Sequence, residues 1–347
     1  MKHFVTNSLV FLKRNIFLSI MAAAVLSCGK GTGYYNIEGY AQGGTYRITL
    51  ETGFRECAEL QKGIERILAD IDNSISGYND SSSLSKFNNN LCENCSDPIL
   101  LDIFAISERM YEECDGYFDI SAGALFDAWG FGFKKGSFPD SGAIDSIRNF
   151  TGMDKITCNN GKLYKSDPRV TLNFNAIAQG YTCDMIGRYL SSEGIDNMLI
   201  NIGGEIFGKG VNPSGQNWTI GIDAPIDGNM EPGTEIQTIL ELPSAATGIV
   251  TSGNYRKFYI RDGKKYAHTI NPKTGYPVNH NLLSATVICG DAATADALAT
   301  YMMAAGLDES IRYVESHQDI EAVLIYEEDG KMKTWMSQGV ITGRNGS

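Results

Sequence analysis

The stretch that decides the fold is 291–336, which begins DAATADALATYMMAAG and ends AVLIYEEDGKMKTWM. Its first part, Asp291 to Gly306, predicts a helix. Its last part predicts two strands, Ala322–Glu327 and Lys331–Met336, joined across Asp329-Gly330, a residue pair typical of tight hairpin turns. Antiparallel hairpins interleaved with helices indicate an α+β fold, not a doubly wound parallel sheet.

The rest of the chain continues this alternation, and no repeat or low-complexity linker interrupts it. We therefore expect one compact domain. Gly116–Phe138 is rich in Gly and aromatic residues, has neither helical nor strand periodicity, and predicts a shaped loop. The other expected elements are a strand at Thr45–Leu50, a helix from about Arg55 to Ser76, a helix starting at Asp97-Pro98, a helix from about Gln179 to Gly194, a strand at Asn197–Ile202, and mostly strands from Trp218 to Ile288.

Composition and charge exclude some function classes. Hydrophobic residues make up 43% of the chain and the formal net charge is −12. An acidic chain with no basic run after the first fourteen residues is a poor nucleic-acid binder. No G-x-G-x-x-G follows a strand in the required context, which disfavours a Rossmann nucleotide site.

The N-terminus has the pattern of a bacterial lipoprotein signal. Lys2, Lys13 and Arg14 precede an apolar run that ends in Leu26-Ser27-Cys28. The run is too short for the ~20 residues that a membrane-spanning helix needs, which disfavours an uncleaved anchor. We expect a signal peptide at 1–27, lipidation at Cys28, a tether at 28–36 and the folded domain at 37–347. The protein would then be lipid-anchored in the cell envelope, facing the periplasm.

Cys92 and Cys95 have the spacing of half a zinc site or of a redox pair. His is scarce and no second such pair exists, which disfavours zinc. Two interpretations stay open: a local disulfide formed in an oxidising compartment, or free and partly buried thiols.

Two clusters carry the strongest chemical pattern. On the expected helix, Asp296 and Thr300 are four residues apart and share a face, which suits Mg²⁺ with its preference for oxygen ligands. The same pair is common on solvated helices. His268 begins a rigid turn with two Pro and a Gly, and imidazole is the side chain best suited to act as a general base near neutral pH, although a lone His is usually structural.

Two further segments expose backbone groups. At Asn173–Tyr181 an extended segment meets a helix, so backbone amides that favour phosphate and carbonyls that ligate cations lie together. In Asn201–Glu205 two glycines permit close approach of the backbone to a ligand, although such turns also occur without one.

Taken together, these motifs resemble one family, the FAD:protein FMN transferases, also called ApbE or flavin-trafficking lipoproteins. The resemblance runs in order along nearly the whole chain after the signal. The segments that carry it are Gly43–Tyr46, Ser76–Asn79 with Ser85–Asn88, Gly116–Ser121, Trp129–Gly132, Asn173–Tyr181, Asn201–Glu205, Thr251–Arg256, His268–Pro277 and Asp296–Thr300.

The resemblance implies a single ApbE-like domain and a defined reaction. Such an enzyme binds FAD with Mg²⁺ on its pyrophosphate and transfers FMN to a Thr or Ser hydroxyl of an acceptor protein, releasing AMP. It implies acceptors such as subunits of the Na⁺-translocating NADH:quinone reductase or of Rnf-type complexes. Relatives that mainly hydrolyse FAD to FMN and AMP, and a non-catalytic flavin-binding lipoprotein, remain as alternatives.

The resemblance also implies roles for individual residues. His268 matches the catalytic base. The metal would be held by Asp296, Thr300 and the backbone carbonyl of Ala176. FAD would be contacted by Gly43, Tyr78, Phe118, Asp119, Ser121, Asn173, Gln179, Ile270 and Ala299. The chain departs from the family pattern at Gly43, where Met is usual, at Asn173, where Asp is usual, at Phe174–Ala176, where a Gly, Ser or Thr run is usual, and at Gln179, where Lys or Glu is common.

Overall fold

The computed structural model describes residues 31–92, 95–134, 136, 138–226, 235–255, 258–261 and 264–343. The predicted signal peptide, the lipidation site Cys28 and the first residues of the predicted tether therefore lie outside the described residues. Within the described ranges, no helix is both long and apolar enough to cross a membrane.

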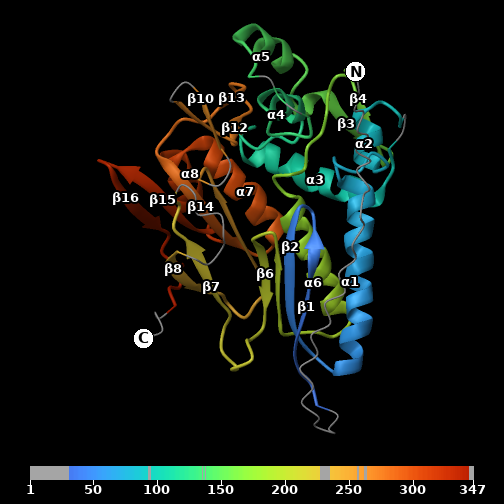
Figure 1. The fold of residues 1–347 in the computed structure, drawn as a ribbon, viewed down its shortest axis with the longest axis vertical. Coiled ribbons are helices and arrows are strands. Elements are labelled where there is room, and N and C mark those ends of the chain that lie inside the picture. Colours follow the sequence, from blue (N-terminus) through green and yellow to red (C-terminus); the bar gives the residue numbers. More distant parts are fainter. Residues whose placement is uncertain are drawn as a thin grey trace, which may run out of the picture. The chain divides into compact units, whose positions relative to one another are not determined.

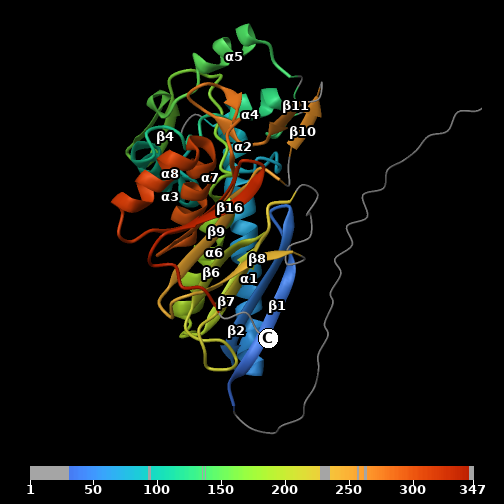
Figure 2. The ribbon, with the colours of Figure 1, turned by 90° about the vertical axis from the view of Figure 1, so that its left-hand side faces the viewer.

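An eight-stranded antiparallel sheet forms the centre of the fold (Figures 1 and 2). Each strand pairs antiparallel with its neighbours, as expected for an α+β fold. In spatial order the strands are β1 Gly33–Ala41, β2 Gly44–Thr52, β5 Met198–Ile202, β6 Glu205–Lys209, β9 Thr247–Gly253, β14 Leu282–Cys289, β15 Glu321–Glu328 and β16 Lys331–Met336.

Both faces of this sheet are covered, which explains the continuous apolar run at Ala322–Ile325. Ala322 and Leu324 face the helix-covered core, whereas Val323 and Ile325 pack against the other cluster. That second cluster is completed by the hairpin of β7 Thr219–Asp223 and β8 Ile236–Glu241. Because successive side chains of a strand point to opposite faces, a strand buried on both sides loses the alternating pattern.

Four helices cover one face of the sheet. They are α1 Phe54–Ile75, α6 Ala178–Ser192, α7 Ala292–Ala305 and α8 Leu307–Ser316. α6 and α7 pack on each other and on the central strands. α7 is apolar nearly all round and is buried along most of its length, as expected for a helix placed inside a core.

A second group of elements gathers at one end of the sheet, at the top of Figures 1 and 2, and carries several predicted site residues. It contains α4 Gly123–Trp129, α5 Ser141–Arg148 and the hairpins formed by β10 Phe258–Arg261 with β11 Lys264–Ala267 and by β12 Ile270–Asn271 with β13 Tyr276–Pro277. The remaining elements are α2 Ser83–Asn88, α3 Pro98–Glu113, the 3₁₀ turn η1 Met153–Lys155, β3 Ile156–Asn159 and β4 Lys162–Lys165.

The structure differs from the sequence-based expectation in several places. The domain starts before residue 37, because β1 begins at Gly33 and pairs with β2 along its whole length. Gly116–Phe138 is only partly a loop, since α4 lies within it and begins at Gly123. Several elements were not expected, namely α2, α5, α8, β3, β4 and β6. α2 is only 6 residues long, and α8 follows α7 after Gly306 alone.

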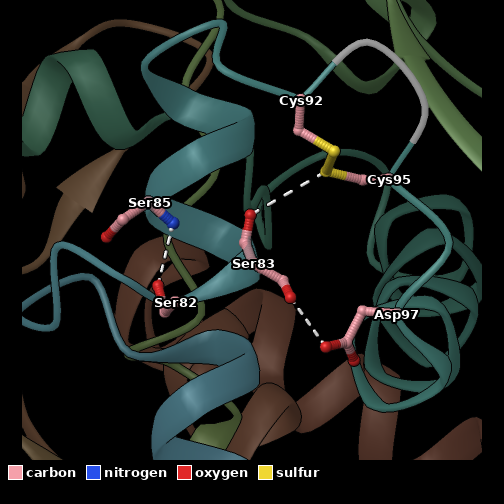
Figure 3. Close-up of a disulfide and its surroundings, with 6 residues drawn as sticks. All are labelled: Ser82, Ser83, Ser85, Cys92, Cys95 and Asp97. Atoms are coloured by element: carbon pink, nitrogen blue, oxygen red, sulfur yellow. Dashed lines mark hydrogen bonds between the residues drawn. A yellow bond between two sulfur atoms is a disulfide. The ribbon is translucent and has the colours of Figure 1, made fainter.

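Cys92 and Cys95 form a disulfide, which decides between the two interpretations left open by the sequence (Figure 3). The Cys95 sulfur also approaches the carbonyl of Ser83 at 3.9 Å. Ser83 in turn donates its hydroxyl hydrogen bond to Asp97, at 2.7 Å. Asp97 caps α3, as the sequence predicted, by accepting from the amides of Ile99 and Leu100. The disulfide loop is therefore joined to the start of α3.

Candidate active site

The N-terminus of α6 is capped by a side chain from another helix. Its N-cap residue, Ile177, makes no side-chain capping bond. The amide of Gly180, the third residue of α6, instead donates to Asp296 Oδ2 of α7 at 3.1 Å. Only glycine fits at position 180, because a Cβ there would collide with the backbone carbonyl of Ala292. The two helices therefore approach with their backbones nearly in contact, and this brings Asp296 to the Asn173–Tyr181 segment.

Asp296 lies inside the protein, not on a solvated helix face. Its exposed fraction is 5%. Burial raises the pKa of Asp296 well above its usual range; the nearby Glu205 carboxylate raises it further, and the Gly180 amide opposes the shift. Two neighbouring carboxylates in a low-dielectric setting favour a bound proton or a bound cation. Thr300, one turn further along α7, is half-buried, whereas Ala299 is fully buried in the core.

Two hairpin turns meet the start of α6. The amide of Gly203, between β5 and β6, donates to the carbonyl of Thr45 in β2 at 3.0 Å. A Cβ at Gly203 would collide with Gln179 Nε2, so the Gln179 side chain lies directly against this turn. On the β1–β2 turn, Gln42 donates to Thr182 of α6 at 2.5 Å, which places the neighbouring Gly43 beside the same helix end.

The predicted FAD contacts from two distant segments lie side by side. The amide of Asn173 donates to the carbonyl of Ile120 at 2.8 Å. The Asn173 side chain is buried and accepts from the amide of Asn175 at 2.9 Å. Asp119 Oδ1 accepts from both the amide and the hydroxyl of Ser121, and burial raises the pKa of Asp119 to about 6 despite these two bonds. The segments 118–121 and 173–175 are thus one connected unit.

Aromatic residues surround His268. Its ring packs edge-on against Phe131, with ring centroids 6.4 Å apart. Phe131 stacks on Tyr259 of β10, and the Tyr259 hydroxyl donates to the carbonyl of Gly130. Trp129 donates its indole N–H to the carbonyl of Gly275 at 2.8 Å. These contacts fix the His268–Pro277 turn against α4 and leave the imidazole half-buried.

A cavity of about 670 Å³ lies at the outer side of the 118–121 segment. Its walls include Asp119, Gly152, Asp154 and Lys273, but not Asp296 or Gln179. The cavity therefore does not reach the junction of α6 and α7. The candidate active site lies at that junction, because Asp296 and Gln179 meet there.

Comparison with known proteins identifies the family. Residues 42–324 match the sequence model of the ApbE family. The chain belongs to the ApbE family. It is 31% identical to the FAD:protein FMN transferase of Vibrio cholerae, over 93% of this chain and 97% of that protein. It is 32% identical to the FAD:protein FMN transferase of Escherichia coli K12, over 87% of this chain and 86% of that protein.

A solved structure agrees with this ApbE assignment. The flavin transferase ApbE from Vibrio cholerae superposes with a TM-score of 0.79 at 30% identity, covering 88% of this chain and 98% of that one. The α+β fold and the family resemblance inferred from the sequence are both confirmed.

The structure distributes the residues predicted from the ApbE resemblance over several places. Asp296, Gln179 and Gly43 converge on the start of α6. Asn173 joins Phe118–Ser121, where the ring of Phe118 is 1% exposed and belongs to the core. Ile270 packs beside α4. Tyr78 follows α1, is 72% exposed and rests edge-on against Phe133, with ring centroids 5.0 Å apart.

One expectation about this ApbE chain is corrected. The first amides of α6 were expected to favour phosphate, but two of them have partners within the protein. The amide of Ala178 donates to the carbonyl of Phe174 at 2.8 Å, and that of Gly180 to Asp296. These two amides therefore hold the helix start and the acidic side chain in place.

Sequence reasoning missed the two residues that hold the ends of α7. Asp184 of α6 accepts from the amides at the N-terminus of α7. His280 Nε2 contacts the carbonyl of Met303 near its C-terminus, at 2.9 Å. The partners of Asp184 lie 108 and 109 residues further along the chain, so no local spacing reveals them. An apolar helix with one acidic residue, such as α7, is the signal that could have revealed the burial of Asp296.

Proposed function

We propose that this chain transfers FMN from FAD to a Thr or Ser hydroxyl of an acceptor protein, in a reaction that depends on Mg²⁺ and releases AMP. A new bond forms between the hydroxyl oxygen and the FMN phosphorus, and the bond from that phosphorus to the bridging oxygen of AMP breaks. The relatives from Vibrio cholerae and Escherichia coli K12 are both named FAD:protein FMN transferase, which supports flavin transfer.

The observation that carries the proposal is the buried Asp296 carboxylate at the start of α6. Its pKa is raised because burial and the nearby Glu205 both disfavour its charged form, and a bound divalent cation would remove that cost. A carboxylate, the Thr300 hydroxyl and the Ala176 carbonyl are hard oxygen donors of the kind Mg²⁺ prefers. These donor types support Mg²⁺ as the metal, which when bound would neutralise charge on the phosphoryl oxygens.

Besides charge neutralisation, the reaction needs a base for the incoming hydroxyl, and we assign this role to His268. The turn that carries it is packed against α4, which holds the imidazole in one place. In the proposed reaction the acceptor hydroxyl gives its proton to the His268 imidazole, while AMP leaves with the electrons of the broken bond.

The test is incubation of the full-length protein with FAD, Mg²⁺ and an acceptor peptide containing Thr, followed by mass spectrometry. Covalent FMN on the peptide, together with AMP in equal amount, is the expected result. Free FMN and AMP without modified peptide would replace the proposal with FAD hydrolysis. If neither modified peptide nor free FMN and AMP is found while FAD stays bound, the protein would instead be a non-catalytic flavin-binding lipoprotein. A Thr→Val peptide is the matched control, since it lacks the hydroxyl.

We also propose that the chain is lipid-anchored at Cys28 in the cell envelope, facing the periplasm, where subunits of Na⁺-translocating NADH:quinone reductase or Rnf-type complexes would be its acceptors. The support is the apolar run ending in Leu26-Ser27-Cys28. Cys28→Ala should leave an unprocessed precursor that takes up no labelled fatty acid. Normal cleavage of the signal peptide in that variant would contradict the proposal.

A further inference from the structure

The first backbone amides of α7, the helix that carries Asp296 and Thr300, donate hydrogen bonds to side chains that lie outside this helix. A helix leaves its first four N–H groups without intrahelical partners. In α7 the amides of Ala292 and Ala293, its first two residues, donate to the two oxygens of Asp184, each at 2.8 Å. The amide of Thr294 donates to Asp291, the local N-cap, also at 2.8 Å. Asp184 is 6% exposed and belongs to α6, so its carboxylate joins two helices.

The link runs in both directions. Asp184 of α6 binds the start of α7, and Asp296 of α7 binds the Gly180 amide at the start of α6. Gly180 and Asp184 are four residues apart on one face of α6, and Ala292 and Asp296 are four residues apart on one face of α7. The two carboxylates therefore act as a pair of clamps, one helical turn apart, between helices that approach too closely for a Cβ at Gly180.

Each clamp is directional. The carboxyl oxygens of Asp184 accept from two backbone N–H groups that have no partner within α7, and these two bonds oppose the rise to about 7 that burial causes in the pKa of Asp184. Because Asp184 uses one oxygen for each amide, it fixes both the rotation and the axial position of α7. A rotation of α7 would move Asp296 and Thr300 together.

We propose that Asp184 is a positioning residue of the flavin-transfer site, which sets α7 so that Asp296 and Thr300 face the bound metal. The inference rests on the proposed function for the identity of the site. Asp184 contacts the backbone of α7 and would act through the register of α6 against α7.

The test compares Asp184→Asn with Asp291→Asn in the full-length protein. Asn at 184 keeps one acceptor oxygen but turns an amide N–H₂ toward the second backbone N–H, so one clamp bond is lost. Asn at 291 is an equally good N-cap, and the hydrogen bond of this side chain ends on Thr294 of α7, which makes it the matched control. Mg²⁺ affinity is measured by calorimetry without FAD, alongside kcat, KM for FAD and the melting temperature.

The expected result for Asp184→Asn is a loss of Mg²⁺ affinity of roughly 10-fold or more and a fall in kcat of similar size, within the range reported for residues that orient metal ligands. KM for FAD at saturating Mg²⁺ should change much less. Asp291→Asn should leave all of these within about twofold. A purely structural role would lower the melting temperature and leave Mg²⁺ affinity within twofold of the wild type, and this outcome, or equal losses in both variants, would overturn the proposal.

A second variant covers the case in which Asp184→Asn does not fold. Asp184→Glu keeps the charge and both acceptor oxygens but is one methylene longer, so it should fold and still weaken Mg²⁺ binding by displacing α7. If neither variant folds, Asp184 is required for the whole domain and the positioning role is rejected. Because Mg²⁺ binding is measured without FAD or acceptor, failure of the wild type to transfer FMN would reject the proposed function separately.

Discussion

The carboxylate of Asp296 and the backbone amide of Gly180 are joined by a hydrogen bond of 3.1 Å between the two helices that flank the candidate site. Asp296 therefore has a structural role, the capping of α6, in addition to its proposed role as a metal ligand. Substitution can separate the two roles, because the hydrogen bond needs only an acceptor oxygen, whereas the negative charge of Asp296 would be the one charge in the proposed donor set.

Asp296→Asn is expected to abolish Mg²⁺-dependent transfer and to preserve the fold. The amide oxygen still accepts from Gly180, and removal of the charge relieves repulsion with Glu205, so the free energy of unfolding should stay equal or rise. Asp296→Ala also loses the cap and should cost roughly 1–3 kcal/mol of stability. Transfer rate at saturating Mg²⁺ and denaturant unfolding decide this. Unchanged activity in Asp296→Asn would place the metal elsewhere.

His268→Ala is expected to slow flavin transfer far more than it weakens FAD binding. A general base contributes typically about 10²–10⁴ in rate. FAD affinity by fluorescence titration and the single-turnover transfer rate are the two measurements. His317→Ala is the control, because that ring stacks on Tyr313 of α8, away from the His268 turn. Equal losses of rate and affinity in His268→Ala would make the residue a cofactor contact.

Asn173→Asp is expected to tighten Mg²⁺ binding in the absence of FAD. The Asn173 oxygen already accepts from the Asn175 amide, and a carboxylate keeps that bond while adding negative charge just before Ala176. For a divalent ion bound about 4–6 Å from this position, at an effective dielectric near 20, that charge would be worth several kcal/mol before desolvation. Part of the gain is lost when FAD is present, since the added charge repels the pyrophosphate. Calorimetry that finds the same affinity in both proteins would show that position 173 does not face the metal.

The sequence predicts most of the sheet and helices because their patterns are local. The turn at Asp329-Gly330 and the cap at Asp97 each specify their element within a few residues, and the structure confirms both. β1 escaped prediction because only Ile37 of its side chains is buried, so a strand at the edge of the sheet carries little hydrophobic signal.

The sequence predicts the motifs of the site but not the contacts between residues that are far apart in the chain. Asp296 and the start of α6 were each recognised, yet their contact joins residues 116 positions apart. The clamp by Asp184 has a similar span. Such links depend on how α6 and α7 pack, which a pattern along one helix does not encode. The burial of Asp296 follows from the same packing, and it excludes the alternative of a pair on a solvated helix face.

The partly buried Asp119 makes the stability of the domain depend on pH. Burial raises its pKa to about 6, so the folded protein holds a proton that the unfolded chain releases near the ordinary value of 3.8. The neutral form stabilises the fold at low pH, and this contribution is lost as the pH rises from about 4 through about 6. Above that window the buried charge is a net cost.

Asp119→Asn is expected to remove this pH dependence. The amide keeps the oxygen that accepts both bonds from Ser121, because both end on Oδ1. At pH 7.5 the variant should be more stable than the wild type by roughly 1–3 kcal/mol, and near pH 4 the two should agree, since a two-unit shift corresponds to about 3 kcal/mol at most. Denaturant unfolding at the two pH values measures the difference. Asp154→Asn, at an exposed neighbouring carboxylate, should change stability by less than about 0.5 kcal/mol at either pH. If Asp119→Asn is instead destabilised equally at both pH values, the prediction is wrong. Asp119 would then stabilise the Ser121 turn only through its hydrogen bonds, and its charge would not lower the stability of the fold.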